Sequence, residues 1–160
     1  MKFKVLTLLA LVSFTFLSCG GEKKEKPSYA PTKKEVVKKA TTEKVDINAP
    51  TLDNKGIGPI KSLTLAAIDD QLVAKGKAVY KTNCSACHKF KKRYIGPALK
   101  GITQRRSPEW IMNMILNPEE MLKKDPVGIA LIKEYNAPMA NQQMKESDAR
   151  AILEYFRTKN

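Results

Sequence analysis

The sequence contains few of the side chains from which metal and catalytic sites are usually built. Its 160 residues include one histidine, His88, and three cysteines. A tetrahedral zinc site takes four ligands, usually cysteine and histidine, but with Cys19 placed in an N-terminal leader only Cys84, Cys87 and His88 remain. The chain also lacks any long alternating pattern of apolar and polar residues, and any internal repeat. Those absences argue against a zinc site and against a sheet, and they favour an all-α fold.

The scarce residues are gathered in one motif, Cys84-Ser85-Ala86-Cys87-His88. C-x-x-C-H is the attachment signature of c-type haem. Two thiols three positions apart can each bond one vinyl group of the porphyrin, and the adjacent histidine is then placed to bind the iron. A redox dithiol of the thioredoxin type would require a βαβ context, which is not seen here. The motif therefore favours one covalent haem c, with a redox dithiol, half a zinc site and a chance match left as alternatives.

The N-terminal residues resemble a bacterial export signal. Two lysines precede an apolar run over residues 5–17, which is shorter than the ~20 residues of a membrane-spanning helix. Cys19 follows Leu17-Ser18 in an arrangement similar to a bacterial lipobox. We predict a lipoprotein-type signal peptide over residues 1–18 and lipidation of Cys19, with simple cleavage or a retained anchor as alternatives. The folded domain would then lie in the periplasm or on the cell surface, held to a membrane by the lipid.

The stretch that follows differs in composition from the rest of the chain. Residues 22–61 contain ten lysines, six acidic residues and four prolines, with few large apolar side chains. Such a sequence cannot bury enough apolar surface to fold alone. We predict a Lys/Pro-rich flexible tether over residues 19–61, with a stretch that binds lipid headgroups as the alternative.

The remaining residues, 62–160, have the size and composition of one small helical domain. We expect its first helix to begin near Thr64 or Asp69 and to run into the motif. A glycine within a helix costs ~1 kcal/mol against alanine, so Gly76 predicts a close crossing with another helix. The last helix of the chain, with Ser147 as its N-cap, is the expected partner.

The middle of this domain also carries helix signals. Ser107-Pro108-Glu109 combines a hydroxyl cap, a proline at the first helical position and an acid in the first turn. This helix should end before Pro118, and a second helix should begin near Pro126. Trp110 is interpreted as a core residue, with a hydrogen bond to a haem propionate as the alternative.

Several motifs in order resemble those of a class I monohaem cytochrome c: Gly76, Tyr80, Cys84–His88, Gly96-Pro97-Ala98-Leu99 and a late methionine. The resemblance covers residues 66–160. It implies crossed terminal helices, a haem held in a crevice, and iron bound by one histidine and one methionine. It also implies that the Pro97 carbonyl accepts a hydrogen bond from His88, which fixes the ring tautomer.

The second iron ligand must come from the six methionines, because no other histidine exists. Met139 follows Pro138 in an irregular stretch before the last helix, which suits a loop laid over a haem. Met144 is the alternative, and Ala140 departs from the proline that usually follows the ligand in the family. We predict His88 and Met139 as the iron ligands.

The formal net charge is +13, and residues 62–160 carry 17 basic and 10 acidic side chains. Basic residues follow both the motif and the Gly-Pro pair, namely Lys89, Lys91, Lys92, Arg93, Lys100, Arg105 and Arg106. We predict that they surround the haem edge and attract an acidic redox partner, with a generic solvated surface as the alternative. Nucleic acid is not an expected partner of an exported haem protein.

Three functions remain after these arguments. The first is a membrane-tethered carrier of single electrons between respiratory partners, which is not an enzyme. The second is a fixed haem subunit of a larger respiratory reductase or oxidase complex. The third, an enzyme or gas sensor with an open sixth position on the iron, is disfavoured by the lack of a second histidine or an acid–base pair beside the haem.

Overall fold

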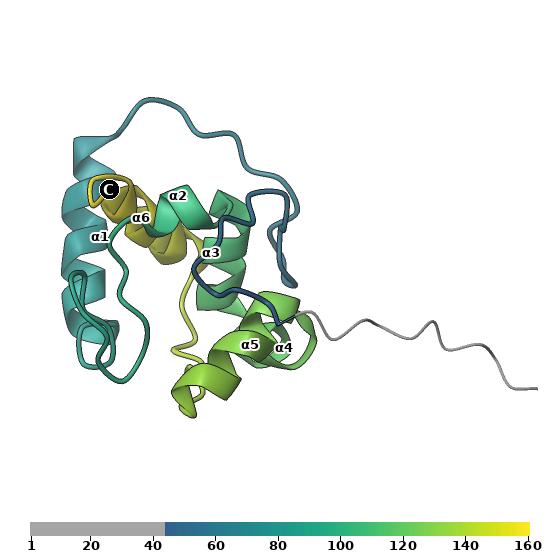
Figure 1. Ribbon diagram of the computed structural model, residues 1–160. Coiled ribbons are helices and arrows are strands. Elements are labelled where there is room, and N and C mark those ends of the chain that lie inside the picture. The colour runs from purple at the N-terminus through teal and green to yellow at the C-terminus, as the bar shows by residue number, and fades with distance from the viewer. Residues whose placement is uncertain (1–43) are drawn as a thin grey trace, which may run out of the picture. The chain divides into compact units, whose positions relative to one another are not determined.

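The computed structural model describes residues 44–160, and over this range the protein is helical (Figure 1). Six helices follow one another along the chain: α1 (Asp70–Asn83), α2 (Ile102–Arg105), α3 (Pro108–Leu116), α4 (Pro118–Lys124), α5 (Pro126–Tyr135) and α6 (Glu146–Arg157). The predicted all-α class is confirmed for the described part, where a single bridge between Thr51 and Arg106 is the only strand-like pairing. The predicted signal peptide, Cys19 and the tether up to residue 43 lie outside the described residues. No helix among residues 44–160 is long and apolar enough to cross a bilayer.

The domain is built on the crossing of α1 with α6 (Figure 1). A Cβ atom at Gly76 would lie 1.9 Å from the carbonyl oxygen of Ala151, so only glycine allows the two backbones to meet there. Asp69 caps α1, since its side chain accepts hydrogen bonds from the amides of Gln71 and Leu72. Of the two predicted starts, Thr64 and Asp69, the structure shows the one at Asp69, and the predicted crossing at Gly76 is confirmed.

The prediction for the start of α6 was wrong. Its N-cap is Lys145, which makes no side-chain capping bond, and Ser147 lies within the first turn. The positive helix end is compensated instead by acids, because Glu146 and Asp148 both stand in that turn. Two acids in the first turn thus replace the hydroxyl cap that the sequence suggested.

A buried ion-pair network fixes α6 to the start of α1. Glu154 is fully buried and pairs with Arg150 and with Arg157 on its own helix. It also accepts a hydrogen bond of 3.0 Å from the backbone amide of Asp69. Burial raises the pKa of Glu154, but the hydrogen bonds from Arg150, Asp69 and Arg157 outweigh burial, and the net pKa is lowered.

The middle helices begin at proline residues, as two of them were predicted to do. Ser107 caps α3 by accepting from the amide of Trp110 at 3.1 Å, and α5 begins at Pro126. The short helix α4 was not predicted. It begins at Pro118 directly after α3 and packs against α5, where a Cβ at Gly128 would lie 2.2 Å from the Met121 carbonyl oxygen.

The N-terminal boundary of the domain differs from the prediction. Residues 46–63, which we call the strap, lie against the helices as an irregular segment (Figure 1), although residues up to 61 were assigned to the flexible tether. Ile60 is 7% exposed and belongs to the core. The fully buried Asn113 side chain binds the strap by donating to the carbonyls of Lys55 and Ile60, at 2.9 and 2.8 Å, and accepting from the Ile60 amide.

Polar side chains supply most of the other bonds to the strap. Asn54 donates to Asp125 at 2.7 Å, and Lys55 pairs with Glu109 at 2.9 Å. Arg106 donates to backbone carbonyls at the start of the strap. The prediction failed because it counted apolar residues, whereas the strap is held mainly by its own backbone groups and by buried polar partners far along the chain.

Candidate cofactor site

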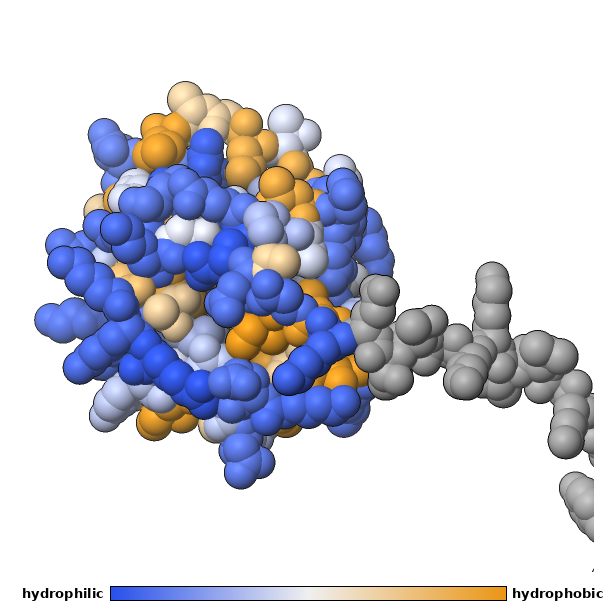
Figure 2. Space-filling model, in the orientation of Figure 1, coloured by the Kyte–Doolittle hydropathy of each residue, from blue (hydrophilic) through white to orange (hydrophobic). Residues whose placement is uncertain are grey.

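A cavity of about 390 Å³ opens between the segment after α1, the loop after α5 and the start of the strap. Its walls are mostly apolar, and Figure 2 shows an apolar area bordered by hydrophilic residues on one face of the domain. All the predicted site residues of the described part line this cavity: Cys84, Cys87, His88, Pro97 and Met139. An apolar cavity of this volume, with a few polar groups in it, is typical of a cofactor site.

The motif lies where α1 ends. The Cys84 amide donates to Tyr80 O at 2.9 Å, and the amides of Cys87 and His88 both donate to Cys84 O, at 3.1 and 2.9 Å. This tight turn presents both thiols and the imidazole to one cavity. The cysteines are not joined by a disulfide.

The Cys84 thiol lacks the lowered pKa of a reactive redox thiol. Burial raises the pKa of the Cys84 thiol to about 11, and the neighbouring Cys87 adds to the rise. Reactive dithiols have lowered pKa values instead. In addition, the described residues contain no group of three or more His, Cys, Asp or Glu side chains arranged to hold a metal ion. Neither alternative interpretation of the motif therefore gains support from the geometry.

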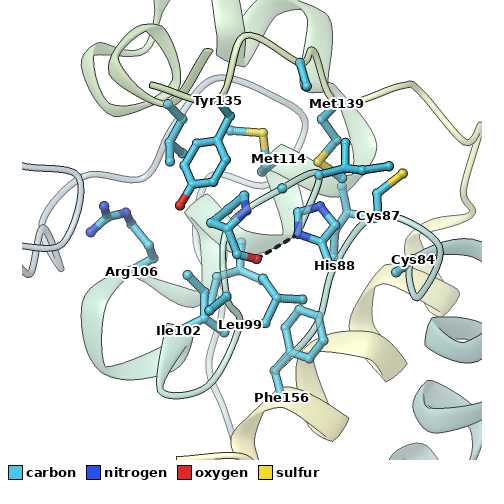
Figure 3. A pocket seen from close by; sticks show the side chains of 18 of the residues that line it. Cys84, Cys87, His88, Leu99, Ile102, Arg106, Met114, Tyr135, Met139 and Phe156 are labelled. Carbon is cyan, nitrogen blue, oxygen red and sulfur yellow. Dashed lines mark hydrogen bonds between the residues drawn. The ribbon is translucent and has the colours of Figure 1, made fainter. Parts of the chain in front are cut away.

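The His88 imidazole is held in one orientation. Its Nδ1 lies 3.1 Å from the Pro97 carbonyl oxygen, drawn as a dashed line in Figure 3. A carbonyl can only accept, so Nδ1 carries the proton and Nε2 keeps its lone pair. Burial lowers the pKa of His88, although the bond to Pro97 opposes this. The ring is thus neutral with one free nitrogen, which is the form that binds a metal.

Gly96 leaves room for this ring. A Cβ at position 96 would lie 2.4 Å from Cε1 of His88 and 3.0 Å from its Nε2. The Gly96-Pro97 pair therefore does two things: the glycine lets the backbone pass close to the imidazole, and the proline carbonyl orients it. The hydrogen bond implied by the family resemblance is present.

Three methionines line the cavity. Met139 and Met144 come from the segment between α5 and α6, and Met114 comes from α3. In Figure 3 the Met139 side chain reaches into the cavity from the loop that follows α5. Met112 and Met121, by contrast, are buried in the core and do not line the cavity. Met114 is also part of the buried core, and the spacing of apolar residues in the sequence cannot show that this side of α3 faces a cavity.

Of two further residues, Arg106 departs from its prediction and Trp110 agrees with its interpretation as a core residue. Arg106, expected on a basic surface, is 2% exposed, and its Nε has no hydrogen-bond partner among residues 44–160. Trp110 is 4% exposed and donates its single indole N–H to Asp125 at 3.0 Å. Its donor is therefore used within the protein, and Trp110 acts as a wall of the cavity.

One contact beside the cavity was not indicated by the sequence. Arg93, in the segment after the motif, pairs with Glu134 Oε1 at 2.5 Å and donates to Glu134 O at 2.9 Å. Its guanidinium also lies 4.2 Å from the centre of the Tyr135 ring. We call this contact the latch. It joins the His88 side of the cavity to the end of α5.

These features fit a covalently bound haem. The donor set combines two thiols, an oriented neutral imidazole and thioethers, which suit iron in a porphyrin. Because Gly96 lets the backbone lie close to the His88 ring, the ring is held in place with one nitrogen free for a coordination bond. The buried Nε of Arg106, on the cavity wall, matches a cofactor that carries carboxylates.

The comparisons with known proteins agree with this fit. The family model described as "Cytochrome c" matches residues 73–159. A "Cytochrome c-553-like" protein of Synechocystis is 35% identical over 66 residues, which are 38% of this chain and 63% of that relative. The chain thus spans less than two thirds of this curated relative.

The similar solved structures cover more of the fold. A cytochrome c from Rhodothermus marinus is 44% identical, with a TM-score of 0.62, over 63% of this chain and 88% of that one. An engineered form of it, whose title describes a bound carbene intermediate, is also 44% identical, with a TM-score of 0.59, over 63% of this chain and 88% of that one.

Proposed function

The chain belongs to the cytochrome c family, which binds haem c covalently, and from this premise we propose that it is a membrane-tethered monohaem carrier of single electrons between respiratory partners. The observation that carries the proposal is the placement of His88 and Met139 on the walls of one cavity. With these two ligands the iron has no free coordination position.

Cys84 and Cys87 attach the cofactor in this proposal. Their Sγ atoms would add to the two vinyl groups and form the thioether bonds, and His88 would bind the iron through Nε2, while its Nδ1 donates to Pro97 O. Because the ring is already oriented, the protein does not have to reorganise to bind the iron on this side.

Met139 is the proposed second iron ligand, with Met144 as the alternative. Met139 follows α5 after two residues of irregular backbone and one left-handed residue, Asn136, which reverses the chain. Met144 lies one residue before the cap of α6, so the start of that helix restricts its reach. Bound haem supplies reversible one-electron chemistry at its iron, and a thioether favours the ferrous state. The apolar side chains that line most of the cavity would limit the contact of a bound haem with water.

The carrier and enzyme hypotheses differ in whether the iron is open. The test is to mix the ferrous protein with carbon monoxide and the ferric protein with peroxide at neutral pH. We expect slow carbon monoxide binding, negligible peroxidase turnover and fast electron exchange with a small inorganic oxidant. Rapid carbon monoxide binding by the native protein would reject the closed carrier and favour the enzyme or sensor.

A basic surface near the cavity supports an acidic redox partner. Lys91, Lys92 and Lys100 are exposed, and Tyr94 and Ile95 form an exposed apolar pair beside them, 53% and 50% exposed. Attraction between such a surface and an acidic protein is screened by salt. The rate of electron exchange with an acidic redox protein should therefore fall as ionic strength rises. A rate that does not depend on salt would contradict this partner.

The membrane tether is proposed from Cys19, which lies outside the described residues. A lipidated Cys19 would hold the protein to a membrane, with the haem domain in the periplasm or on the cell surface. Cys19→Ser should move the protein from the membrane pellet to the soluble fraction. Protein that stays in the pellet would indicate a retained anchor.

A further inference from the structure

Tyr80 is hydrogen-bonded to both ends of the Cys84–His88 motif. Its backbone carbonyl accepts from the amides of Cys84 and Ser85, at 2.9 and 3.0 Å. Its hydroxyl donates to the backbone carbonyl of His88 at 2.8 Å. One residue near the end of α1 thus holds the first and the last residue of the motif at once.

The His88 carbonyl differs from its neighbours in the kind of donor that it accepts from. The carbonyls of Cys84, Cys87 and Lys89 accept from backbone amides. The His88 carbonyl has no backbone amide as a partner among residues 44–160, and the Tyr80 hydroxyl takes that place. The backbone that carries the imidazole is therefore attached to α1 by a side chain, through one oxygen atom.

The Tyr80 ring is packed so that its hydroxyl stays where this bond requires it. Tyr80 is 8% exposed. Its ring centre lies 5.0 Å from that of Phe90, 5.7 Å from that of Tyr155 and 6.0 Å from that of Phe156. Ring centres separated by ~4.5–7 Å form stabilising aromatic pairs, so the Tyr80 ring has little freedom to move away from His88.

We propose that Tyr80 is a positioning residue for the iron ligand His88: its hydroxyl fixes the ligand's backbone, while the Pro97 carbonyl fixes the ligand's ring through Nδ1. The imidazole is then held at two points on different segments of the chain. The same contact keeps the motif turn closed, with both thiols on the cavity wall. This inference rests on the haem c in the cavity and on His88 as its ligand, and not on Met139 or on the carrier function.

The bond acts on the position of His88 and hardly on its basicity. Saturated carbon atoms separate the backbone carbonyl from the imidazole, so a hydrogen bond to the carbonyl changes the electrons of the ring little. Removing the hydroxyl leaves a partly buried carbonyl without its donor, which makes it easier for the ligand to leave its place. The expected change is therefore in how firmly the iron is held, with little change in the midpoint potential.

The test compares Tyr80→Phe with a matched control, Tyr155→Phe, in the haem-loaded full chain. Both changes remove one hydroxyl from the same group of packed rings, and both tyrosines are 8% exposed. Among residues 44–160 the hydrogen bonds of Tyr155 are made by its backbone and not by its hydroxyl. The control therefore leaves the bond to the His88 carbonyl intact.

Nitric oxide is the probe of the His88–iron bond, because it takes the sixth position of ferrous iron and weakens the bond opposite to it. The electron paramagnetic resonance spectrum, recorded at equilibrium and neutral pH, gives the ratio of five- to six-coordinate nitrosyl haem. We expect Tyr80→Phe to raise this ratio about tenfold, which is ~1.4 kcal/mol and is of the size expected for one hydrogen bond. Tyr155→Phe should leave the ratio near its native value.

Two results would overturn the proposal. An unchanged nitrosyl ratio in Tyr80→Phe, together with a lower free energy of unfolding in denaturant, would make the hydroxyl a structural contact only. An equal rise of the ratio in both variants would assign the effect to the packing of the rings and not to the bond with His88.

The native protein supplies a test that does not depend on the folding of a variant. The chain has one histidine, so carbon-13 labelling of histidine carbonyls marks the His88 carbonyl alone. In the ferrous, diamagnetic state, the Tyr80 hydroxyl proton should exchange slowly and show a nuclear magnetic resonance contact with this carbon. The absence of that contact would reject the proposal. Rapid carbon monoxide binding would refute the closed carrier and leave this result untouched, so the two failures are distinguishable.

Discussion

The two sides of the cavity are built in different ways. On the His88 side, called here the proximal wall (residues 84–97), bonds such as Gly96 N to Cys87 O at 2.9 Å and Tyr80 Oη to His88 O at 2.8 Å join the segment to itself and to α1. The other side is formed by the distal loop (residues 136–145). In the described structure, residues 137–144 of this loop make only one hydrogen bond, from the Gln143 amide to Asn141 Oδ1. Gln143 also has a positive φ of 51°, which is unfavourable for a residue other than glycine.

The difference indicates that the polypeptide orients His88, but not the distal ligand, before any cofactor is bound. The proximal imidazole is oriented by the polypeptide alone, whereas the distal loop has few bonds of its own and would rely on contacts with a bound haem and on the proposed Met139–iron bond. Segments with few hydrogen bonds open at low free energy. We therefore expect ligand loss to occur on the distal side, and the following changes test this contrast.

The largest effect should follow removal of the covalent bonds on the proximal wall. Cys84→Ala combined with Cys87→Ala should leave no haem on the chain after denaturation and acid–acetone extraction, because no thioether remains. Ser85→Ala, a change within the same turn, should retain the haem. Haem that survives extraction in the double variant would refute the assignment of Cys84 and Cys87.

The next largest effect should come from the distal methionine. Met139→Ala should abolish the weak near-infrared band of a methionine–iron bond, lower the midpoint potential and allow rapid carbon monoxide binding, because the iron loses its thioether. Met144→Ala should do none of these. If the two variants exchange behaviour, Met144 is the ligand and the distal loop binds iron from its other end.

Adding or removing one methyl group should change stability by different amounts in the proximal wall and in the distal loop. Gly96→Ala should lower the free energy of unfolding by ~1–3 kcal/mol, because the new Cβ would lie 2.4 Å from the His88 ring. Ala140→Gly in the distal loop, where the side chain is exposed, should cost less than about 1 kcal/mol. Denaturant unfolding of the haem-loaded proteins measures both, and equal costs would remove the contrast.

The smallest effect on stability should come from the latch. Arg93 and Glu134 are both about half exposed, 54% and 50%, so Arg93→Ala should change the free energy of unfolding by less than ~1 kcal/mol. It should nevertheless speed the replacement of the sixth ligand by cyanide several-fold, because the latch holds the end of α5 that leads into the distal loop. Lys133→Ala, a neighbouring charge change, is the control. A cyanide rate equal to that of the native protein would exclude the latch from this role.

The parts of the fold that the sequence predicted are those with local signals. Gly76 predicted the helix crossing because a glycine within a helix needs a reason, and Ser107-Pro108 predicted the start of α3 because cap chemistry acts within one turn. The prediction of Ser147 as an N-cap was wrong for a related reason, since any serine near the start of a helix resembles a cap. The N-cap is in fact Lys145, two residues earlier, and acids in the first turn take the place of a hydroxyl cap.

The parts that the sequence did not predict depend on contacts between distant residues. The strap has the composition of a tether, and its order comes from partners such as Asn113 and Asp125 that no local pattern identifies. Arg106 was assigned to the surface because it stands beside the basic residues that follow Gly-Pro. Its burial arises from the strap that covers it, so both errors share one physical cause.

The position of the strap in the chain also affects how the domain is assembled. Ile60 binds Asn113, 53 residues later, and Asn54 binds Asp125, 71 residues later. Such long loops close slowly compared with local helix formation, so the strap, which emerges from the ribosome before the helices, should dock after them. Until it does, the cavity beside Arg106 is uncovered while the Cys84 and Cys87 thiols are already displayed at the end of α1. Late docking of an early segment would thus keep an entrance open for the haem until attachment is complete.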